Sequence, residues 1–347
     1  MLQPDVQSIC ILRLSAIGDV CNAIAAVQAI QRRYPNAKIT WIIGKIERQL
    51  LQNLPGIRFV VFDKSQGWRA YRQLKRDLAG QTFDYLLHMQ LAFRANLAAL
   101  CVNARVKVGF PKHHAKELHS LVVNQHVDFP EHPHVLDGFA AFAKFLDADI
   151  QTLQWHLPIQ ADDQQWAKAH LPDNAKLLVL SPSASKQERN WTTEGYIAIG
   201  RWAIQQGFDV VLCGGPGAHE KALASTIAEQ LQSCTDLTGK TTLQQMLAVL
   251  KQASVVIAPD TGPAHMANAL GTPVVGLYAH SNPQRTGPYR YQQYVVNYYP
   301  LALQQTLGKR PDEVRWGTRA KGETLMHNIT VDDVKTMLTR VIEEQQL

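Results

Sequence analysis

The feature that most constrains the fold is an alternation of short apolar runs with helical patterns, which occurs twice along the 347-residue chain. In the first half, residues 9–14 and 85–89 are typical of buried strands, and helical patterns lie between most such runs. In the second half, residues 177–180 and 255–258 repeat the arrangement. Apolar strands that alternate with helices predict parallel sheets covered by helices on both faces. We therefore predict an α/β protein with two such domains.

The expected elements place a boundary near the middle of the chain. The expected strands are residues 9–14, 38–43, 58–62, 85–89 and 105–108, and then 177–180, 209–213, 255–258 and 274–277. The expected helices are residues 19–33, 68–78, 135–146, 193–206, 218–231, 243–250 and 331–342. A stretch rich in His, Lys and Pro (111–134) breaks the rhythm, and a looser stretch (147–172) follows. We predict domains at residues 1–160 and 161–330, with a terminal helical segment at 331–347.

The composition limits the class of protein. A chain of this length is long for one core, which also favours two domains. Its 46% hydrophobic and 18% charged residues are typical of a globular soluble protein. No apolar stretch approaches the roughly 18 residues that span a bilayer. The N-terminus has no basic region before its short apolar run, so we predict no signal peptide.

The cysteines and the net charge add two expectations. The scattered cysteines form no CxxC pair, which indicates buried reduced thiols in a cytoplasmic protein; they are Cys10, Cys21, Cys101, Cys213 and Cys234. The formal net charge of +6 indicates an anionic partner. One basic stretch contributes Arg105, Lys107, Lys112, His113, His114 and Lys116. Such a stretch is usually a solvated loop, and the few aromatic residues near it argue against nucleic acid.

Ligands are expected where the strands end, because parallel sheets bind them beyond the carboxyl ends of their strands. Two such domains facing each other predict a cleft. The loop "LSAIGDVCNAI" (14–24) holds Gly18 but no GxGxxG motif, which counts against a nicotinamide or flavin enzyme. Asp19 opens a helix in this loop. It is either a first-turn acid that stabilises the helix or a general base at the cleft.

Two loops of the second half offer groups to a nucleotide. The loop "LSPSASKQERNWTTEGY" (180–196) supplies hydroxyls and a cation from Ser183, Ser185 and Arg189, which suit a phosphate. The alternative is a polar loop that ends at a helix cap. The loop "LCGGPGAHEKALA" (212–224) supplies three glycines and Glu220, which is either a ribose contact or an exposed first-turn acid.

The stretch "APDTGPAHMANAL" (258–270) joins a strand to a helix start. Free backbone N–H groups and the helix dipole attract anions at such a junction. Thr261 and Gly262 supply these amides, and Pro263 removes an N–H that would have no partner. Asp260 adds a carboxylate, and His265 is by itself as typical of a helix core as of a site. Amides beside an acid suit a ligand that presents phosphates and hydroxyls together, such as a nucleotide-diphospho-sugar.

Four pieces of the chain together resemble glycosyltransferase family nine, the heptosyltransferases of the lipopolysaccharide inner core. They are "RLSAIGDV" (13–20), "ERNW" (188–191), "PDTGPAH" (259–265) and "GTPVVGLY" (271–278), in the right order and spacing. The resemblance covers most of the chain and implies the GT-B fold, in which two Rossmann-like domains with parallel sheets face each other across a cleft. It implies an N-terminal acceptor domain, a C-terminal nucleotide-sugar domain and a terminal helix (331–347) that packs back on the first.

The resemblance also implies the reaction. It implies an inverting, metal-independent transfer of heptose from ADP-L-glycero-D-manno-heptose to the Kdo-lipid A inner core, with the first heptose favoured. It implies no cofactor and no metal. The acceptor is an anionic lipid, so the basic stretch would contact its headgroup, and the enzyme would be cytoplasmic and peripheral at the inner face of the bacterial inner membrane.

Position by position, the resemblance assigns residues to three roles. Asp19 matches the general base. The donor site would comprise Ser183, Ser185, Arg189, Glu220, Asp260, Thr261, Gly262 and His265. The acceptor site would comprise Ser15 and Gly18, and we add Lys112 and Lys116 of the basic stretch. The family often has Lys where this chain has Arg189, and Arg still neutralises a leaving diphosphate but donates a proton less readily.

Two other interpretations remain open at this point. Within the family, the chain could add the second heptose instead of the first. In a different class, it could be a GT-B-like sugar-nucleotide epimerase or a nucleotide-binding protein, because the fold does not fix the chemistry. An epimerase would act on the nucleotide sugar alone, whereas a transferase needs an acceptor.

Overall fold

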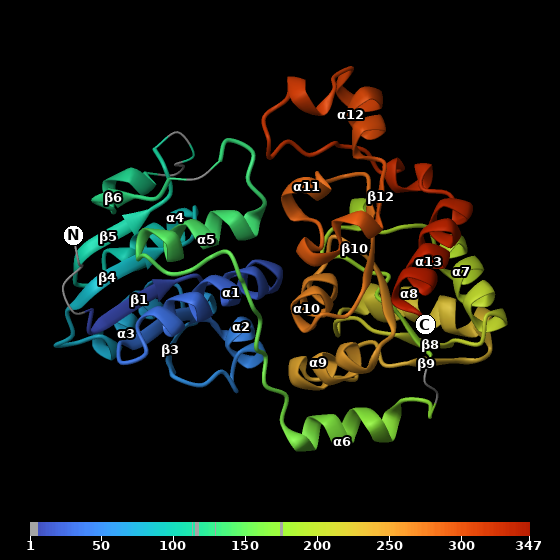
Figure 1. Ribbon diagram of the computed structural model, residues 1–347, viewed down its shortest axis with the longest axis horizontal. Helices are drawn as coiled ribbons and strands as arrows, with labels where there is room; N and C mark the ends of the chain where they lie inside the picture. Colours follow the sequence, from blue (N-terminus) through green and yellow to red (C-terminus); the bar gives the residue numbers. More distant parts are fainter. Residues whose placement is uncertain (1–5, 113, 115–117, 129, 174–175) are drawn as a thin grey trace. The chain divides into compact units, whose positions relative to one another are not determined.

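A computed structural model describes residues 6–112, 114, 118–128, 130–173 and 176–347. The chain divides into two compact units, unit 1 (Met1–Pro158) and unit 2 (Ile159–Leu347), where the sequence placed a boundary between 160 and 161. Each unit contains a six-stranded sheet whose neighbouring strands are all parallel (Figure 1). The prediction of an α/β protein with two parallel sheets is confirmed.

The sheet of unit 1 has the strand order β3-β2-β1-β4-β5-β6. Its strands are β1 (Ser8–Leu12), β2 (Lys38–Gly44), β3 (Ile57–Phe62), β4 (Phe83–His88), β5 (Ala104–Gly109) and β6 (Gln125–His126). Its helices are α1 (Ile17–Arg33), α2 (Lys45–Leu50), α3 (Trp68–Asp77), α4 (Phe93–Ala99) and α5 (Val135–Phe145). The expected helix over 19–33 therefore begins two positions earlier, with Ala16 as its N-cap.

Both faces of this sheet are buried, as the continuous apolar strands predict. Successive side chains of a strand point to opposite faces. Cys10 and Leu12 of β1 pack with buried residues of α3 and α4, such as Leu74 and Ala98. Ile9 and Ile11 of β1, which point to the other face, are also fully buried. This two-sided burial requires the apolar runs that identified the strands.

The sheet of unit 2 has the strand order β12-β11-β10-β7-β8-β9. Its strands are β7 (Leu177–Leu180), β8 (Asp209–Leu212), β9 (Cys234–Asp236), β10 (Val255–Pro259), β11 (Val274–Tyr278) and β12 (Val295–Asn297). Its helices are α6 (Ala161–His170), α7 (Thr193–Gln205), α8 (Ala218–Leu231), α9 (Leu243–Gln252), α10 (Gly262–Leu270), α11 (Pro283–Thr286), α12 (Tyr299–Leu307) and α13 (Val331–Gln345).

The terminal helix α13 corrects one prediction. We expected it to pack back on the first domain. Its apolar stripe, Val334, Leu338 and Val341, instead lies in the core of unit 2, where α13 contacts α7, β11 and β12. The Tyr298 hydroxyl donates to Asp333 Oδ2 at 2.8 Å, which ties the first turn of the helix to the same unit. Three apolar residues at helical spacing need one continuous surface, and unit 2 supplies it.

The strand order fixes where each unit can bind a ligand. In unit 1 the chain leaves the sheet centre in opposite directions from β1 and β4, which are neighbours. In unit 2 the corresponding neighbours are β7 and β10. Loops that leave such a pair diverge and open a crevice at the carboxyl ends of the strands. The quoted motifs "RLSAIGDV", "ERNW" and "PDTGPAH" all follow these central strands.

Candidate functional site

Four side chains from three adjacent strand exits meet in unit 2. Asp260 follows β10, Arg189 follows β7 and Ser281 follows β11. Arg189 Nη1 lies 3.5 Å from Asp260 Oδ2 and donates to the Asp260 carbonyl at 2.9 Å. The Ser281 hydroxyl donates to Asp260 Oδ2 at 2.9 Å, and His265 Nε2 lies 3.4 Å from Oδ1. The sequence predicted three members of this cluster and missed Ser281, although its position just beyond an apolar strand is a usable signal.

The charge of Asp260 is stabilised by these partners. Burial raises the pKa of this carboxyl, but the His265 hydrogen bond and charge, the Arg189 charge and the Ser281 hydroxyl together lower it below its ordinary value. Asp260 is therefore ionised at neutral pH, with only 12% of its side chain exposed. A buried carboxylate held in this way accepts hydrogen bonds from a ligand hydroxyl.

Polar groups without partners gather at the exit of β7. The hydroxyls of Ser181 and Ser183 and the Nε of Arg189 are buried, and none has a hydrogen-bond partner among the described residues. An unpaired buried polar group costs about 1–3 kcal/mol. Three such groups in one loop indicate a place for an acceptor-rich ligand such as a phosphate. Ser185, also predicted here, is exposed on the same loop.

The first turn of α10 supplies a backbone donor beside this loop. Thr261 is the N-cap, and its hydroxyl accepts from the Ala264 N–H at 3.4 Å. Pro263 carries no N–H, so Gly262 provides the first-turn amide that no intrahelical acceptor can satisfy. His265, in the same helix, is buried, and its ring contacts Asp260. The Gly262 amide at the start of α10 therefore lies next to Asp260 and its partners, where β10 ends.

Glu220 and Thr238 lie where β8 and β9 end. Glu220 Oε2 accepts from the Gly215 N–H at 2.7 Å, so this carboxylate stabilises the glycine-containing turn that follows β8. The Thr238 hydroxyl is buried without a partner among the described residues, and the Thr238 methyl lies 3.0 Å from where a Cβ on Gly214 would be. The first-turn role of Glu220 is thus present. Sequence reasoning missed Thr238.

In unit 1, Asp19 forms an ion pair with Arg13 at the exit of β1. Arg13 Nη1 also donates to the carbonyl of Met89, just beyond β4, at 2.7 Å. Asp19 Oδ2 accepts from the Ala16 N–H at 3.4 Å and retains 34% exposure. Asp19 thus caps α1 and is also accessible, while Ser15 and Gly18 flank it, each half-buried. The sequence missed Arg13, a charge inside an apolar run.

A buried histidine pair lies beside this exit. His88 Nε2, at the end of β4, donates to Asn96 Oδ1 at 2.8 Å, and His119 Nδ1 lies 3.2 Å from the same oxygen. His119 Nε2 accepts from the Phe110 N–H at 3.1 Å, so its proton is on Nδ1. Burial lowers the pKa of His88 to about 3 and that of His119 to about 4. Both rings are neutral and together join β4, α4 and the chain after β5.

This pair predicts that unit 1 loses stability in mild acid. A histidine whose pKa is lower when folded stabilises the fold fully above about pH 6.5 and loses that contribution as the pH falls. From the pKa of His88, we expect a loss of about 2 kcal/mol between pH 7.5 and pH 5. Thermal unfolding at a series of pH values measures the loss. The variant His88→Gln, which does not titrate, is expected to show a shallower pH dependence.

His170 provides the matched control, because it is an exposed histidine on α6 of unit 2. The variant His170→Gln is expected to keep the pH dependence of the unmodified protein. If His88→Gln and His170→Gln melt with the same pH dependence, the acid sensitivity does not come from the buried pair.

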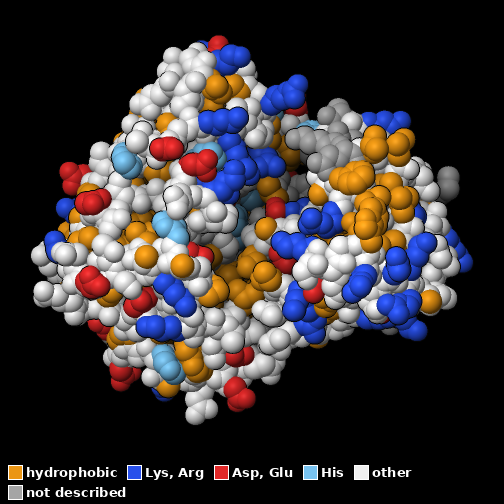
Figure 2. All heavy atoms as spheres, turned by 180° about the vertical axis from the view of Figure 1, so that it is seen from behind, with side chains coloured by type: hydrophobic (Ala, Val, Ile, Leu, Met, Phe, Trp, Pro, Cys, Tyr) orange, Lys and Arg blue, Asp and Glu red, His pale blue; other side chains and the backbone are white. Residues whose placement is uncertain are grey.

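The basic stretch after β5 is partly described. Lys112 is exposed, whereas Lys116 and His113 lie outside the described residues. Phe110, next to this stretch, is buried and packs edge-on against Phe142 at 5.1 Å between ring centroids. Leu118 and Leu121 remain exposed, by 64% and 77% of their surface. Hydrophobic side chains and clusters of Lys and Arg lie side by side on the face drawn in Figure 2.

The described residues include no candidate metal site and no candidate membrane-spanning helix. In the described part of the chain, no group of three or more His, Cys, Asp or Glu side chains is placed to hold a metal ion. Among the helices that the structure describes, none is both long enough and apolar enough to cross a bilayer. The cysteines Cys10, Cys21 and Cys213 are buried, and burial raises their thiol pKa values, as expected for packed thiols.

Comparison with protein families gives one match over most of the chain. The model of glycosyltransferase family 9 (heptosyltransferase) matches residues 71–311. A protein of Haemophilus influenzae, the lipopolysaccharide core heptosyltransferase OpsX, is 41% identical over 329 residues, which cover 94% of this chain and 95% of that protein. The match includes both units, so the likeness is not confined to one sheet.

Solved structures share the fold at low identity. The glycosyl transferase family 9 structure from Veillonella parvula has a TM-score of 0.81 at 19% identity and covers 99% of both chains. The E. coli heptosyltransferase WaaC, solved with ADP, has a TM-score of 0.75 at 19% identity and covers 96% of this chain and 100% of its own. This likeness shows that the two-sheet architecture described above is the GT-B fold.

Proposed function

The chain belongs to glycosyltransferase family 9, the heptosyltransferases, and we propose that it transfers heptose from ADP-heptose to the Kdo-lipid A inner core of lipopolysaccharide. Unit 2 binds the donor and unit 1 binds the acceptor. The reaction inverts the anomeric carbon and needs no metal. The relatives support the donor and the lipopolysaccharide core, since one is a core heptosyltransferase and another was solved with ADP.

The order of the strands supports one orientation of the donor along the edge of the sheet. Going from β9 to β11, the exits carry Glu220 and Thr238, then the β7 loop and the α10 N-terminus, and then Asp260 with Ser281. We assign the nucleoside to Glu220 and Thr238. The diphosphate is assigned to the β7 loop and the α10 N-terminus, and the heptose to Asp260 and Ser281. Neighbouring strands lie about 4.8 Å apart, so these exits span the length of an extended nucleotide sugar.

One observation carries the donor assignment. The β7 exit holds two buried serine hydroxyls and a buried guanidinium nitrogen without partners among the described residues, beside the α10 N-terminus. A diphosphate supplies the acceptors that these donors lack. As the diphosphate leaves, its growing negative charge is stabilised by Arg189 and the helix dipole. This arrangement performs the role that a divalent cation has in other transferases, so we expect EDTA to leave activity unchanged.

Asp19 is the proposed general base. It is accessible at the exit of β1, and Arg13 holds its carboxylate in place. It would take the proton from the acceptor hydroxyl as the oxygen attacks the anomeric carbon on the face opposite the leaving diphosphate. A single displacement of this kind breaks the bond to the diphosphate oxygen, forms the bond to the acceptor oxygen and inverts the configuration.

The basic stretch of unit 1 predicts a salt-dependent acceptor interaction. Surface cations attract an anionic headgroup over a range that salt screens to roughly 8 Å at physiological strength. We therefore expect the acceptor KM to rise with ionic strength, and the double variant Lys112→Gln, Lys116→Gln to raise it several-fold at low salt. The donor KM is expected to change little. Steady-state kinetics at several salt concentrations measure both constants.

A matched pair of cations near the amino ends of the strands of the same sheet controls for net charge. Arg33 and Lys38 are exposed, and Lys38 opens β2 at its amino end. Their double Gln variant is expected to leave the acceptor KM unchanged. A Lys112, Lys116 variant that weakened ADP binding and spared the acceptor would reverse the assignment of the basic stretch. Sedimentation with anionic vesicles tests the accompanying proposal that the enzyme works at the inner-membrane surface.

A comparison of two acceptors tests whether the protein transfers heptose and whether it adds the first heptose. The protein is incubated with ADP-heptose and either heptose-free or mono-heptosylated Kdo-lipid A, and products are identified by mass. Addition of one heptose to the heptose-free acceptor, with little addition to the other, is the expected result. Addition only to the mono-heptosylated acceptor would identify a second-heptose transferase, and absence of transfer to both would contradict the proposal.

A further inference from the structure

A pocket in unit 2 lies beyond the donor groups described above. A depression that is open to solvent lies between the loop that follows β11 and the segment 316–319. Two arginines, Arg285 and Arg319, line it together with Ser281, Trp316 and Thr318, and none of the described residues that line it is a carboxylate. Its walls therefore carry two guanidinium groups and hydroxyl donors.

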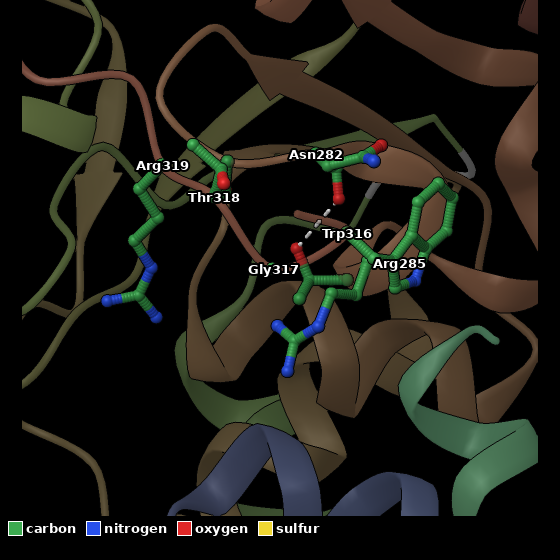
Figure 3. A pocket seen from close by; sticks show the side chains of 8 residues that line it. Asn282, Arg285, Trp316, Gly317, Thr318 and Arg319 are labelled. Carbon is green, nitrogen blue, oxygen red and sulfur yellow. Dashed lines mark hydrogen bonds between the residues drawn. The ribbon is translucent and has the colours of Figure 1, made fainter. Parts of the chain in front are cut away.

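The two arginines reach the pocket from different segments. Arg285 belongs to α11, whereas Arg319 follows a turn in which the Thr318 N–H donates to the Arg315 carbonyl at 2.8 Å. In Figure 3 both guanidinium groups extend toward the same side, with the Trp316 ring beside Arg285. Arg285 Nε lies 3.7 Å from where a Cβ on Gly317 would be, so this guanidinium lies within van der Waals reach of the segment. A guanidinium group is suited to carboxylate and phosphate oxygens.

Backbone contacts hold the second segment against the strand exit. The Ala320 N–H donates to the His280 carbonyl at 3.0 Å, and the Tyr299 hydroxyl donates to the Thr318 carbonyl at 2.8 Å. Ala320 is fully buried. The backbone on either side of Arg319 is thus held against the loop after β11, which also carries Ser281, and the Arg319 side chain is exposed beside that loop.

Ser281 and His280 connect the pocket to the donor site. Ser281 lines the pocket and donates to Asp260, the group assigned to the heptose. His280 is 3% exposed, and neither ring nitrogen has a partner among the described residues. Burial lowers the pKa of His280; the Glu188 charge opposes this shift, and the charges of Arg189 and Arg319 add to it. Along the strand order, the pocket therefore lies on the heptose side of the donor, away from the nucleoside.

We propose that this pocket binds an oxyanion of the acceptor, a carboxylate or a phosphate monoester, through Arg285 and Arg319. The donor phosphates are assigned to the β7 exit, and the acceptor is the remaining reactant at the heptose end. The inference rests on the proposed function, because it uses that orientation of the donor. It gives unit 2 a direct part in choosing the acceptor.

The test compares the double variant Arg285→Ala, Arg319→Ala with Arg315→Ala. Arg315 is an exposed arginine of the same segment that does not line the pocket, so it controls for charge and for the turn. Loss of charge-assisted hydrogen bonds is expected to raise the acceptor KM about 10-fold to 100-fold, with ADP affinity and melting temperature unchanged. Arg315→Ala is expected to match the unmodified protein. Acceptors with and without a phosphate on Kdo distinguish the source of the oxyanion: a defect confined to the phosphorylated acceptor identifies the phosphate, and an equal defect identifies the carboxylate.

Two results would overturn the inference. One is an acceptor KM that does not change in the double variant, and the other is a weaker ADP interaction with an unchanged acceptor KM. A protein that fails to transfer heptose at all would contradict the proposed function instead. In that case inorganic phosphate, added to ADP-saturated protein, still tests the pocket: phosphate is expected to raise the melting temperature of the Arg315→Ala protein more than that of the double variant, and equal shifts would exclude an oxyanion site.

Discussion

The variant Asp19→Asn is expected to lower kcat by about 10²-fold or more while ADP affinity stays nearly unchanged. The amide keeps the size of the side chain and a hydrogen-bond acceptor for the Ala16 N–H, but it cannot take a proton. The Arg13 guanidinium retains its bond to the Met89 carbonyl, so its position is preserved. Single-turnover kinetics with saturating donor and acceptor separate this chemical defect from substrate binding.

A second first-turn acid shows what a helix cap alone contributes. Asp333 occupies the same position in α13 and accepts from the Thr330 N–H at 3.0 Å. Asp333→Asn is expected to lower the melting temperature without a change in kcat. If Asp19→Asn behaved in the same way, with lost stability and normal turnover, Asp19 would be a structural cap and the base would lie elsewhere.

The variants Arg189→Ala and Asp260→Ala are expected to weaken different ligands. Arg189 is assigned to the diphosphate, so its loss is expected to weaken ADP and ADP-heptose equally, by about 10-fold to 100-fold. Asp260 is assigned to the heptose, so its loss is expected to weaken ADP-heptose about 10-fold more than ADP. Calorimetry with both ligands on both proteins measures the division. Equal losses of the two ligands in Asp260→Ala would contradict the assignment of the carboxylate to the sugar.

The contact between Arg189 and Asp260 makes two further variants necessary. Removing one partner of a buried pair leaves the other charge uncompensated, at a cost of about 3–5 kcal/mol in stability. Asp260→Asn keeps an acceptor for Ser281, and the Arg189, Asp260 double Ala variant is expected to lose less stability than the two single variants summed. Arg201→Ala, at an exposed arginine of α7, controls for loss of charge in the same unit. It is expected to bind both ligands normally.

The sequence predicted the sheets because their strands are buried on both faces. Such strands are apolar at every position, so they stand out even at four or five residues, as Leu177–Leu180 and Val255–Pro259 do. The three-residue edge strands β9 and β12 carry too few apolar residues to be distinguished from loops. The sequence does not predict the helix α6, because a helix with one buried position among its described residues, Ala167, has no apolar stripe to identify it.

The candidate site was predicted only where local motifs carry it. Asp260, Thr261 and His265 share one motif, and Arg189 belongs to another. The sequence therefore predicts these four residues as site residues. Ser281 and Thr238 act through contacts with residues 21 and 24 positions away, and no local pattern contains such contacts. Arg13 lies in the same motif as Asp19, but its bond to the Met89 carbonyl, 76 positions away, is not part of that motif. The sequence also does not predict the unit on which α13 packs, because an apolar stripe predicts that a helix packs but not on which surface.

Release of ADP from ADP-heptose, measured with and without heptose-free Kdo-lipid A in the presence of EDTA, tests the central claim most directly. A transferase that uses Asp19 and the donor site of unit 2 is predicted to release one ADP for each heptose found on the acceptor, and almost none without acceptor. Release or epimerisation of the donor at the same rate without acceptor would contradict transfer as the function of this chain. A requirement for a divalent cation would contradict the part assigned to Arg189 and the α10 N-terminus.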